Sequence, residues 1–154
     1  MQNKKSLWNL LLAGALLLLF SSCSKEKEKP AAPTIEVVHL GIHEAEEDGI
    51  FYLGEEGHFE VNIKVPGRIK KIELEIYQES GYGIFSLSKV YEGDYVGRKE
   101  VPGFQDYPVI PEGEAIGAYS FHLKVTDQEG QVAALDENIT VKAGDGSGEH
   151  EHEH

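Results

Sequence analysis

The stretch GAYSFHLKVTDQEGQ, Gly117–Gln131, decides the fold. Apolar residues occupy its odd-numbered positions from Tyr119 to Val125, and polar residues lie between them. This period of two is typical of a strand with one buried and one solvent-facing side. A turn follows from Asp127 to Gly130, where the aspartate can accept backbone amides and the glycine can take a positive φ. The stretch therefore predicts a hairpin between the last two strands.

The same alternation appears earlier in the chain and predicts further half-buried strands. Its apolar positions are odd-numbered in 58–65 and even-numbered in 71–77, within the expected strand 69–78. With 117–126, the other expected strands are 34–40, 83–91, 105–110 and 131–142, with a brief edge pairing at 50–53. About seven short strands with no helical period predict an all-β, immunoglobulin-like antiparallel β-sandwich.

Turn residues punctuate these strands. Turns are expected at Pro66–Gly67, Ser80–Gly81, Glu92–Asp94, Pro102–Gly103 and Pro111–Gly113. The segment 92–104 as a whole favours no single structure. Tyr119 stands near the start of its strand, where its hydroxyl can bond a backbone carbonyl a few residues upstream, as in the tyrosine corner of immunoglobulin-type sandwiches.

The N-terminus has the features of a lipoprotein signal peptide. Two lysines precede an apolar run from Leu7 to Phe20, which is too short for a stable membrane span. Small residues then precede Cys23, the only cysteine, which predicts lipidation of its thiol. Several acyl chains would anchor the protein stably. The alternative is that Cys23 is incidental to an ordinary cleavage site.

The expected organisation follows from these features. Residues 1–22 are a signal peptide, 23–33 a lipidated cysteine with a flexible tether, 34–143 the sandwich, and 144–154 a disordered tail. The tether alternates Lys and Glu before Pro and Ala, so it has nothing to bury. Ser24 resembles an outer-membrane sorting signal, and we expect the outer membrane as the location, facing either the periplasm or the exterior.

The composition limits the function classes. The chain has 14 basic and 27 acidic residues, a net charge of −13. Loss of the two signal-peptide lysines leaves 12 basic residues against 27 acidic, or −15. This charge argues against nucleic acid and anionic membrane surfaces as partners, so the expected membrane contact is the N-terminal lipid. We expect a monomeric domain.

Catalytic motifs are missing from the sequence. It contains no G-x-S-x-G elbow and no phosphate-binding glycine loop. The H-E-x-x-H spacing occurs only in the HEHEH end at 150–154, where no helical period supports it. The single thiol is assigned to the lipid, and abundant carboxylates do not make a placed acid–base pair. The sequence therefore favours a protein that is not an enzyme.

The segment IPEGEAIGAYSF at 110–121, followed by VTDQEG at 125–130, resembles a family of bacterial lipoproteins of unknown function that carry an immunoglobulin-like domain. The cysteine-containing signal and the Pro33-Thr34-Ile35 entry also fit that family. The resemblance implies an exported sandwich domain and brings no established activity. Members of the family carry histidines after the third strand, whereas residues 76–85 of this chain contain none.

The C-terminal tail carries the most distinctive chemistry. It ends in alternating Glu149, His150, Glu151, His152, Glu153 and His154. Imidazole nitrogens bind Zn²⁺, Cu²⁺ or Ni²⁺ near neutral pH, and carboxylates can add oxygen ligands. An extended strand would space alternate histidines about 7 Å apart, so one ion requires a chain that can curl. Two alternatives stay open: a solvating acidic end, and an engineered purification tag.

Two further sets of residues are candidates. A secondary metal site is formed by His39, His43, Glu44, Glu46 and Asp48, although a solvated turn is the more frequent arrangement for such residues. His58 and His122 are expected on the solvent-facing sides of their strands, as ordinary surface residues. A partner surface is formed by Tyr77, Tyr82, Tyr91, Tyr95 and Tyr107, although core and rim packing is the more frequent use of tyrosine.

The leading hypothesis is non-catalytic capture or buffering of a divalent transition metal at the cell envelope, with an outer-membrane uptake receptor as recipient. The metal would be Zn²⁺, Cu²⁺ or Ni²⁺ and would not be required for the fold. The alternative is an adhesion or accessory module that binds a protein or glycan through loops in 77–107.

Overall fold

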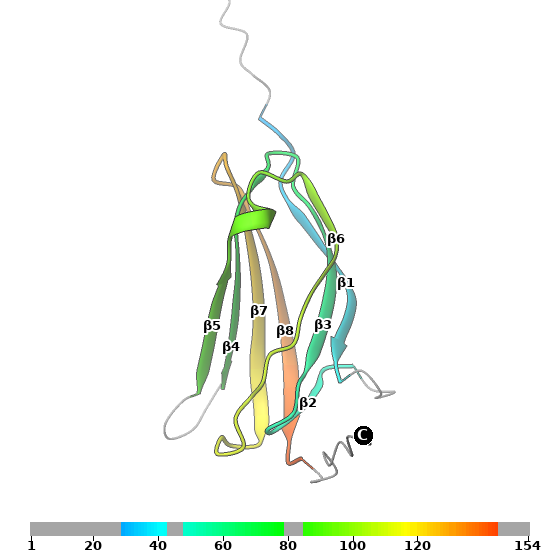
Figure 1. The fold of residues 1–154 in the computed structure, drawn as a ribbon, viewed down its shortest axis with the longest axis vertical. Coiled ribbons are helices and arrows are strands. Elements are labelled where there is room, and N and C mark those ends of the chain that lie inside the picture. Colours follow the sequence, from blue (N-terminus) through cyan, green and yellow to red (C-terminus); the bar gives the residue numbers. More distant parts are fainter. Residues whose placement is uncertain (1–28, 43–47, 79–84, 145–154) are drawn as a thin grey trace, which may run out of the picture.

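The computed structural model describes residues 29–42, 48–78 and 85–144. The described chain folds into two packed β-sheets (Figure 1). The strands are β1 Thr34–Gly41, β2 Ile50–Tyr52, β3 His58–Lys64, β4 Ile69–Gln78, β5 Ser86–Tyr91, β6 Glu100–Asp106, β7 Gly117–Asp127 and β8 Val132–Lys142. A short 3₁₀ helix, η2, spans Gly93–Tyr95. The predicted all-β sandwich is therefore confirmed.

The two sheets differ in size. One has three strands in the order β1-β3-β6, and the other has five in the order β2-β8-β7-β4-β5. Every neighbouring pair is antiparallel except β2 and β8, which pair in parallel from Ile50↔Thr140 to Tyr52↔Lys142. The expected edge pairing at 50–53 is this short strand, β2, which brings the strands of the described residues from the expected seven to eight.

The core fills the space between the sheets because the alternating apolar side chains of both point inward. The buried residues of the long strands are Phe59, Val61, Ile63, Ile72, Leu74, Ile76, Phe121, Leu123 and Val125. Aromatic rings cross from one sheet to the other: Phe59 meets Phe121 edge-on, with ring centroids 5.2 Å apart. This arrangement matches the odd and even alternation in the sequence.

The decisive hairpin forms as predicted. Asp127 is fully buried, and its Oδ1 accepts the backbone N–H of Gln131 at 2.6 Å. Gly130 takes a φ of 81°. The Tyr119 hydroxyl donates to the Ala115 carbonyl at 2.7 Å, which is the expected corner bond. Burial, and to a smaller degree Glu114, raises the pKa of Tyr119, so this hydroxyl keeps its proton.

One strand prediction is wrong. The strand expected at 105–110 lies at 100–106, so Pro102–Gly103 belongs to β6 and does not form a turn. β6 is at the edge of its sheet, where a missing N–H is tolerated. The register shifts between Val61 and Ile63, Gly103 has a φ of 61°, and its N–H reaches the Asn62 side chain at 3.0 Å. A bulge next to an edge proline resembles a turn in sequence.

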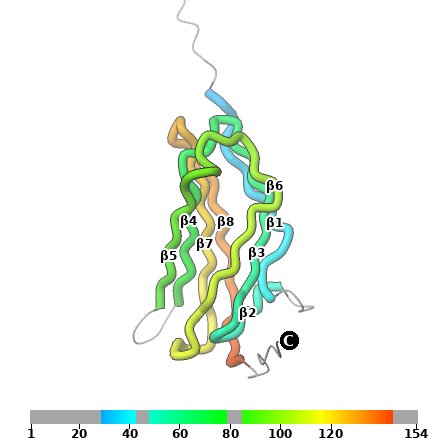
Figure 2. Tube along the Cα trace, viewed as in Figure 1, coloured from blue at the N-terminus to red at the C-terminus, as the bar shows by residue number. Residues whose placement is uncertain are grey.

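The chain enters and leaves the sandwich at opposite ends (Figure 2). The entry end contains residues 29–33, 64–70 around the β3–β4 turn, 92–100 around the connection that follows β5, and 127–131 around the β7–β8 turn. The exit end contains residues 48–57, which include β2, the 107–116 connection and residues 142–144. β7 has 11 residues and runs between the two ends, which therefore lie about 35 Å apart.

Among the residues that the structure describes, no helix is long and apolar enough to cross a membrane. The predicted signal peptide and Cys23 lie outside the described residues, as do His43, Glu44, Glu46, Tyr82 and all six His and Glu residues of 149–154.

Candidate functional site

Three rings form a row across the outer face of the three-stranded sheet. His39 lies on β1, His58 begins β3, and Tyr107 directly follows β6. The ring centroids of His39 and His58 are 5.0 Å apart, and those of His58 and Tyr107 are 4.9 Å apart. Both pairs are stacked, at interplanar angles of 28° and 18°. The strand order β1-β3-β6 therefore gathers residues that are far apart in the sequence.

His58 departs from its expected environment. The sequence predicts an exposed surface residue, but His58 is only 5 % exposed although it lies on the outer face. The rings of His39 and Tyr107 cover it from both sides, and Nε2 lies 3.3 Å from Gln105 Oε1. The period of β3 places His58 on the outer face correctly, but the neighbouring strands determine whether it is covered.

The ring row lies at the exit end. Gly57, which precedes His58, donates its N–H to the Pro108 carbonyl at 3.0 Å. Leu53 donates to the Lys142 carbonyl at 3.0 Å, and a Cβ placed on Gly144 would lie 2.9 Å from Leu53 O. The last described residues of the chain therefore lie against Leu53, five residues before His58 in the sequence.

The pair supplies two imidazoles but not a complete metal centre. Across 29–42, 48–78 and 85–144, no group of three or more His, Cys, Asp or Glu side chains is placed to hold an ion. Two imidazoles are fewer ligands than zinc takes from a protein, which are four in structural sites and three in catalytic ones. Of the secondary metal candidates, His39 lies on β1 and Asp48 in the turn before β2.

His122 lies on the opposite side of the molecule, on the outer face of the five-stranded sheet. Its Nδ1 contacts Asp136 Oδ1 on β8, and Glu75 on β4 is its partner in register on the other side. Its side chain is 27 % exposed. The two strand histidines therefore face away from each other, and they do not form a shared site.

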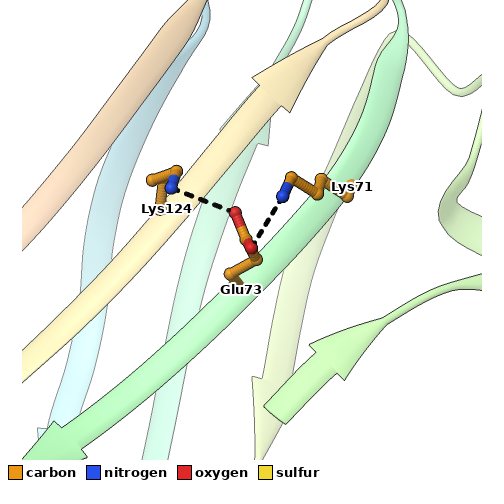
Figure 3. A network of polar contacts seen from close by, with 3 residues as sticks. All are labelled: Lys71, Glu73 and Lys124. Carbon is orange, nitrogen blue, oxygen red and sulfur yellow. Dashed lines mark hydrogen bonds and ion pairs between the residues drawn. The ribbon is translucent and has the colours of Figure 1, made fainter. Parts of the chain in front are cut away.

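The same outer face carries an ion-pair network (Figure 3). Glu73 on β4 contacts Lys71 Nζ at 2.7 Å and Lys124 Nζ on β7 at 3.2 Å. The hydrogen bond from Lys71, with smaller contributions from Lys124, lowers the pKa of Glu73 although burial opposes the shift. Exposed pairs of this kind contribute little to stability, so the network is consistent with a solvated face.

The structure does not gather the candidate partner-binding tyrosines on one surface. Tyr91 is buried, and Tyr95 packs against Phe104 with centroids 5.1 Å apart. Tyr77 and Tyr107 are exposed by 40 % and 46 %, but Tyr77 lies on the outer face of the five-stranded sheet and Tyr107 on that of the three-stranded sheet. Packing therefore explains the candidates Tyr91 and Tyr95, whereas Tyr77 and Tyr107 face different directions.

Tyr91 also belongs to a polar cluster that joins the two sheets. Its hydroxyl donates to Asp106 Oδ2 at 2.5 Å, and Lys89 Nζ donates to the same oxygen at 2.6 Å. Burial and the bond to Asp106 raise the pKa of Tyr91 above its ordinary value. Burial alone would raise the pKa of Asp106. The hydrogen bonds from Lys89 and Tyr91 together outweigh burial, so the pKa of Asp106 lies below its ordinary value. The cluster connects β5 to β6 and serves the fold.

Comparison with known proteins adds a family and a distant likeness. No curated protein matches the chain. A solved structure titled sporulation control protein Spo0M from Bacillus subtilis is similar at a TM-score of 0.45 and 17 % identity, over 74 % of this chain and 51 % of that one. The chain therefore spans about half the length of that structure. A family model described as Domain of unknown function (DUF4625) matches residues 21–142, and the chain belongs to this family.

Proposed function

We propose that this chain is a non-catalytic envelope lipoprotein that captures or buffers a divalent transition metal, Zn²⁺, Cu²⁺ or Ni²⁺. The ligands are the histidines of the C-terminal tail, His150, His152 and His154, assisted by Glu149, Glu151 and Glu153. Cys23 carries the lipid, the outer membrane is the location, and an outer-membrane uptake receptor receives the metal. Imidazole and carboxylate ligands in this combination suit borderline divalent ions.

The observation that carries the proposal is the position at which the chain leaves the domain. Residues 143–144 depart at the exit end, about 35 Å from the entry end, by the length of β7. Residues 29–33, which lead back toward Cys23, enter at the opposite end. The tail is therefore attached at the end of the domain away from the anchor, where a soluble ion or a receptor can reach it.

The charge of the exit end supports the same function. Its described acidic residues are Asp48, Glu55, Glu56, Glu112 and Glu114, and its described basic residue is Lys142. An acidic surface attracts cations and raises their local concentration. The His39–His58 pair lies at the same end and supplies two further imidazoles there. Three features that favour a cation thus occur together.

The test is calorimetric titration of Zn²⁺, Cu²⁺ and Ni²⁺ into the soluble chain 24–154. We expect about one equivalent to bind with a Kd at or below about 10 μM, which corresponds to roughly 7 kcal/mol. The matched variant His150→Gln/His152→Gln/His154→Gln keeps the length and the glutamates, and we expect it to lose this binding. A second variant, Glu149→Gln/Glu151→Gln/Glu153→Gln, should retain most of it.

Two results would contradict the tail as the ligand. Equal binding by the chain ending at Ala143 would move the site into the folded domain, and His39→Gln/His58→Gln would then identify it. An absence of binding below about 1 mM in every variant would leave the tail as a solvating end. No second function is proposed on the tyrosines, because the described ones do not share a surface.

A further inference from the structure

The entry end carries a group of exposed basic side chains that the proposed metal function does not use. They are Lys64, Arg68, Lys70, Arg98 and Lys99. We call them the basic end group. They come from the 92–99 connection and from residues 64–70, which are the β3–β4 turn with the adjoining ends of β3 and β4. The two segments lie side by side through backbone hydrogen bonds. Ile69 donates to the Arg98 carbonyl at 2.8 Å, and Val65 donates to the Lys99 carbonyl at 2.6 Å.

The basic end group has not been neutralised within the domain. No ion pair among the described residues includes any of its five members. In contrast, Lys71, Lys89 and Lys124 each contact a carboxylate. Arg68 uses one guanidinium nitrogen to bond the Gly97 carbonyl at 2.9 Å, and the rest of that group faces outward as an exposed residue. These side chains remain available to anions outside the protein.

Charge is distributed unevenly along the long axis of the domain. With Lys29, the entry end has six basic residues against five acidic ones, which are Glu92, Asp94, Glu100, Asp127 and Glu129. The exit end has one described basic residue, Lys142, against five described acidic ones. A domain that is strongly acidic as a whole therefore has one end without an acidic excess.

Distance and salt decide which charges a nearby surface would meet. The screening length at physiological ionic strength is about 8 Å. The exit end lies about 35 Å from the entry end, so its carboxylates are screened from a surface that touches the basic end group. The net charge, which argues against anionic membranes as partners, is therefore the wrong quantity for this end. The local charge is the relevant one.

The chain is fastened at this end. Gln131 Nε2 donates to the Pro30 carbonyl at 2.9 Å and to Asp127 Oδ2 at 2.9 Å. These two hydrogen bonds hold the incoming chain against the buried aspartate of the β7–β8 turn. Five residues lie between Cys23 and Lys29, and the six steps from one to the other can span at most about 20 Å. A lipid on Cys23 therefore keeps the entry end close to the membrane surface.

We propose that the basic end group is a docking surface for the phosphate groups of anionic lipids in the membrane that anchors the chain. The inference rests on the lipid attachment stated in the proposed function. Because the anchor makes docking intramolecular, weak contacts are enough to orient the domain. Each lysine or arginine near such a surface favours docking by about fivefold. The domain then stands on its entry end and holds the exit end and its tail away from the bilayer.

The test uses the single cysteine. The mature chain 23–154 is coupled through Cys23 to maleimide lipid in vesicles, which reproduces the attachment whether or not the native thiol is acylated. The acetylation rate of each lysine is then followed by mass spectrometry on phosphatidylcholine vesicles and on vesicles with phosphatidylglycerol added. We expect Lys64, Lys70 and Lys99 to react about fivefold more slowly on the anionic vesicles and Lys142 to be unchanged. About 1 M salt should remove the difference, because screening is then about 3 Å.

A matched pair of variants sharpens the test. Lys70→Gln/Arg98→Gln neutralises two side chains that make no bond among the described residues. We expect the protection of Lys64 and Lys99 to fall on anionic vesicles. Glu55→Gln/Glu56→Gln changes the same number of charges at the exit end and should leave that protection intact. Equal rates on both vesicles, protection of Lys142, or no response to the first variant would overturn the proposal. The metal titration contains no vesicles, so the two proposals fail separately.

Discussion

The entry end and the exit end of the sandwich differ in how their connections are built. At the entry end, β3 is joined to β4 by residues 65–68 and β7 to β8 by residues 128–131, both tight turns held by local hydrogen bonds. The longer 92–99 connection at this end is bonded to the β3–β4 region, by Val65 N–H to the Lys99 carbonyl and by Gly97 N–H to the Ile69 carbonyl. At the exit end, β6 is joined to β7 by residues 107–116, and rings from three strands stack beside it. Binding groups commonly occur on longer connections that a rigid scaffold positions. The two proposals place attachment at the entry end and metal capture at the exit end.

The largest effect is expected from Asp127→Ala at the entry end. The substitution leaves the buried N–H of Gln131 and its Nε2 without their acceptor, and it removes the group that fills the space beside Gly67. Loss of a buried acceptor is among the few mechanisms with large stability effects, and we expect Tm to fall by about 10 °C. Thermal unfolding of Glu129→Ala, an exposed residue of the same turn, is the control. Similar Tm values for both variants would show that the buried carboxylate does not hold this end.

A smaller loss is expected at the exit end from His58→Ala. The change removes a covered ring between His39 and Tyr107, and the gap exposes both neighbours. We expect Tm to fall by about 7 °C. His122→Ala is the matched control, because His122 occupies the corresponding outer face of the other sheet and is more exposed, and we expect a change of no more than about 3 °C. If the two variants unfold alike, the ring row has no structural role.

Tyr119→Phe should have a still smaller effect. It removes only the hydroxyl that donates to the Ala115 carbonyl and keeps the ring in the core. One neutral hydrogen bond contributes about 1 kcal/mol, which is about 5 °C in Tm. The same deletion at the exposed Tyr77 should leave Tm unchanged. A larger shift for Tyr77→Phe than for Tyr119→Phe would contradict the corner bond as the element that secures the 107–116 connection.

The smallest expected effect is a change in the pH dependence of stability, and it arises at the entry end. Burial alone would raise the pKa of the Asp127 carboxyl. Hydrogen bonds from the side chain and backbone of Gln131 outweigh burial, so the pKa of Asp127 lies below its ordinary value. A group with a depressed folded pKa stabilises the fold above its unfolded pKa, about 3.9, and loses that contribution as the pH falls through the folded pKa. We therefore expect the Tm of the wild-type protein to fall more steeply below about pH 4 than that of Asp127→Asn. Parallel curves would remove Asp127 from the acid response.

The parts of the fold that depend on local sequence could be predicted. Strand 69–78 was predicted with the same bounds, and the turn from Asp127 and the Tyr119 bond are confirmed because each depends on residues only a few positions apart. β6 was misplaced because a proline and a glycine in an edge strand have the same local signature as a turn. Local patterns cannot distinguish a bulge from a turn without the neighbouring strand.

The site was less predictable for a related reason. Alternation correctly places His58 on an outer face, but its cover comes from β1 and from the residue after β6, which lie about 20 and 50 positions away. The basic end group has the same origin, because the β3–β4 turn and the 97–99 segment are neighbours only in the folded sheet. The tail and the 43–47 part of the secondary candidate lie outside the described residues, so their metal ligands stay predictions.

The parallel pairing of β2 with β8 also affects the order in which the sandwich can assemble. β2 spans 50–52 and its partner residues are 140–142, so this pairing joins segments about 90 positions apart. Gln131 and Pro30 are 101 positions apart. Contacts of such long range form slowly, because the intervening chain must first be ordered. The early strands cannot complete either end of the domain until β8 is available. If the chain is exported as proposed, this order of assembly would keep it unfolded until nearly all of the domain has crossed the membrane.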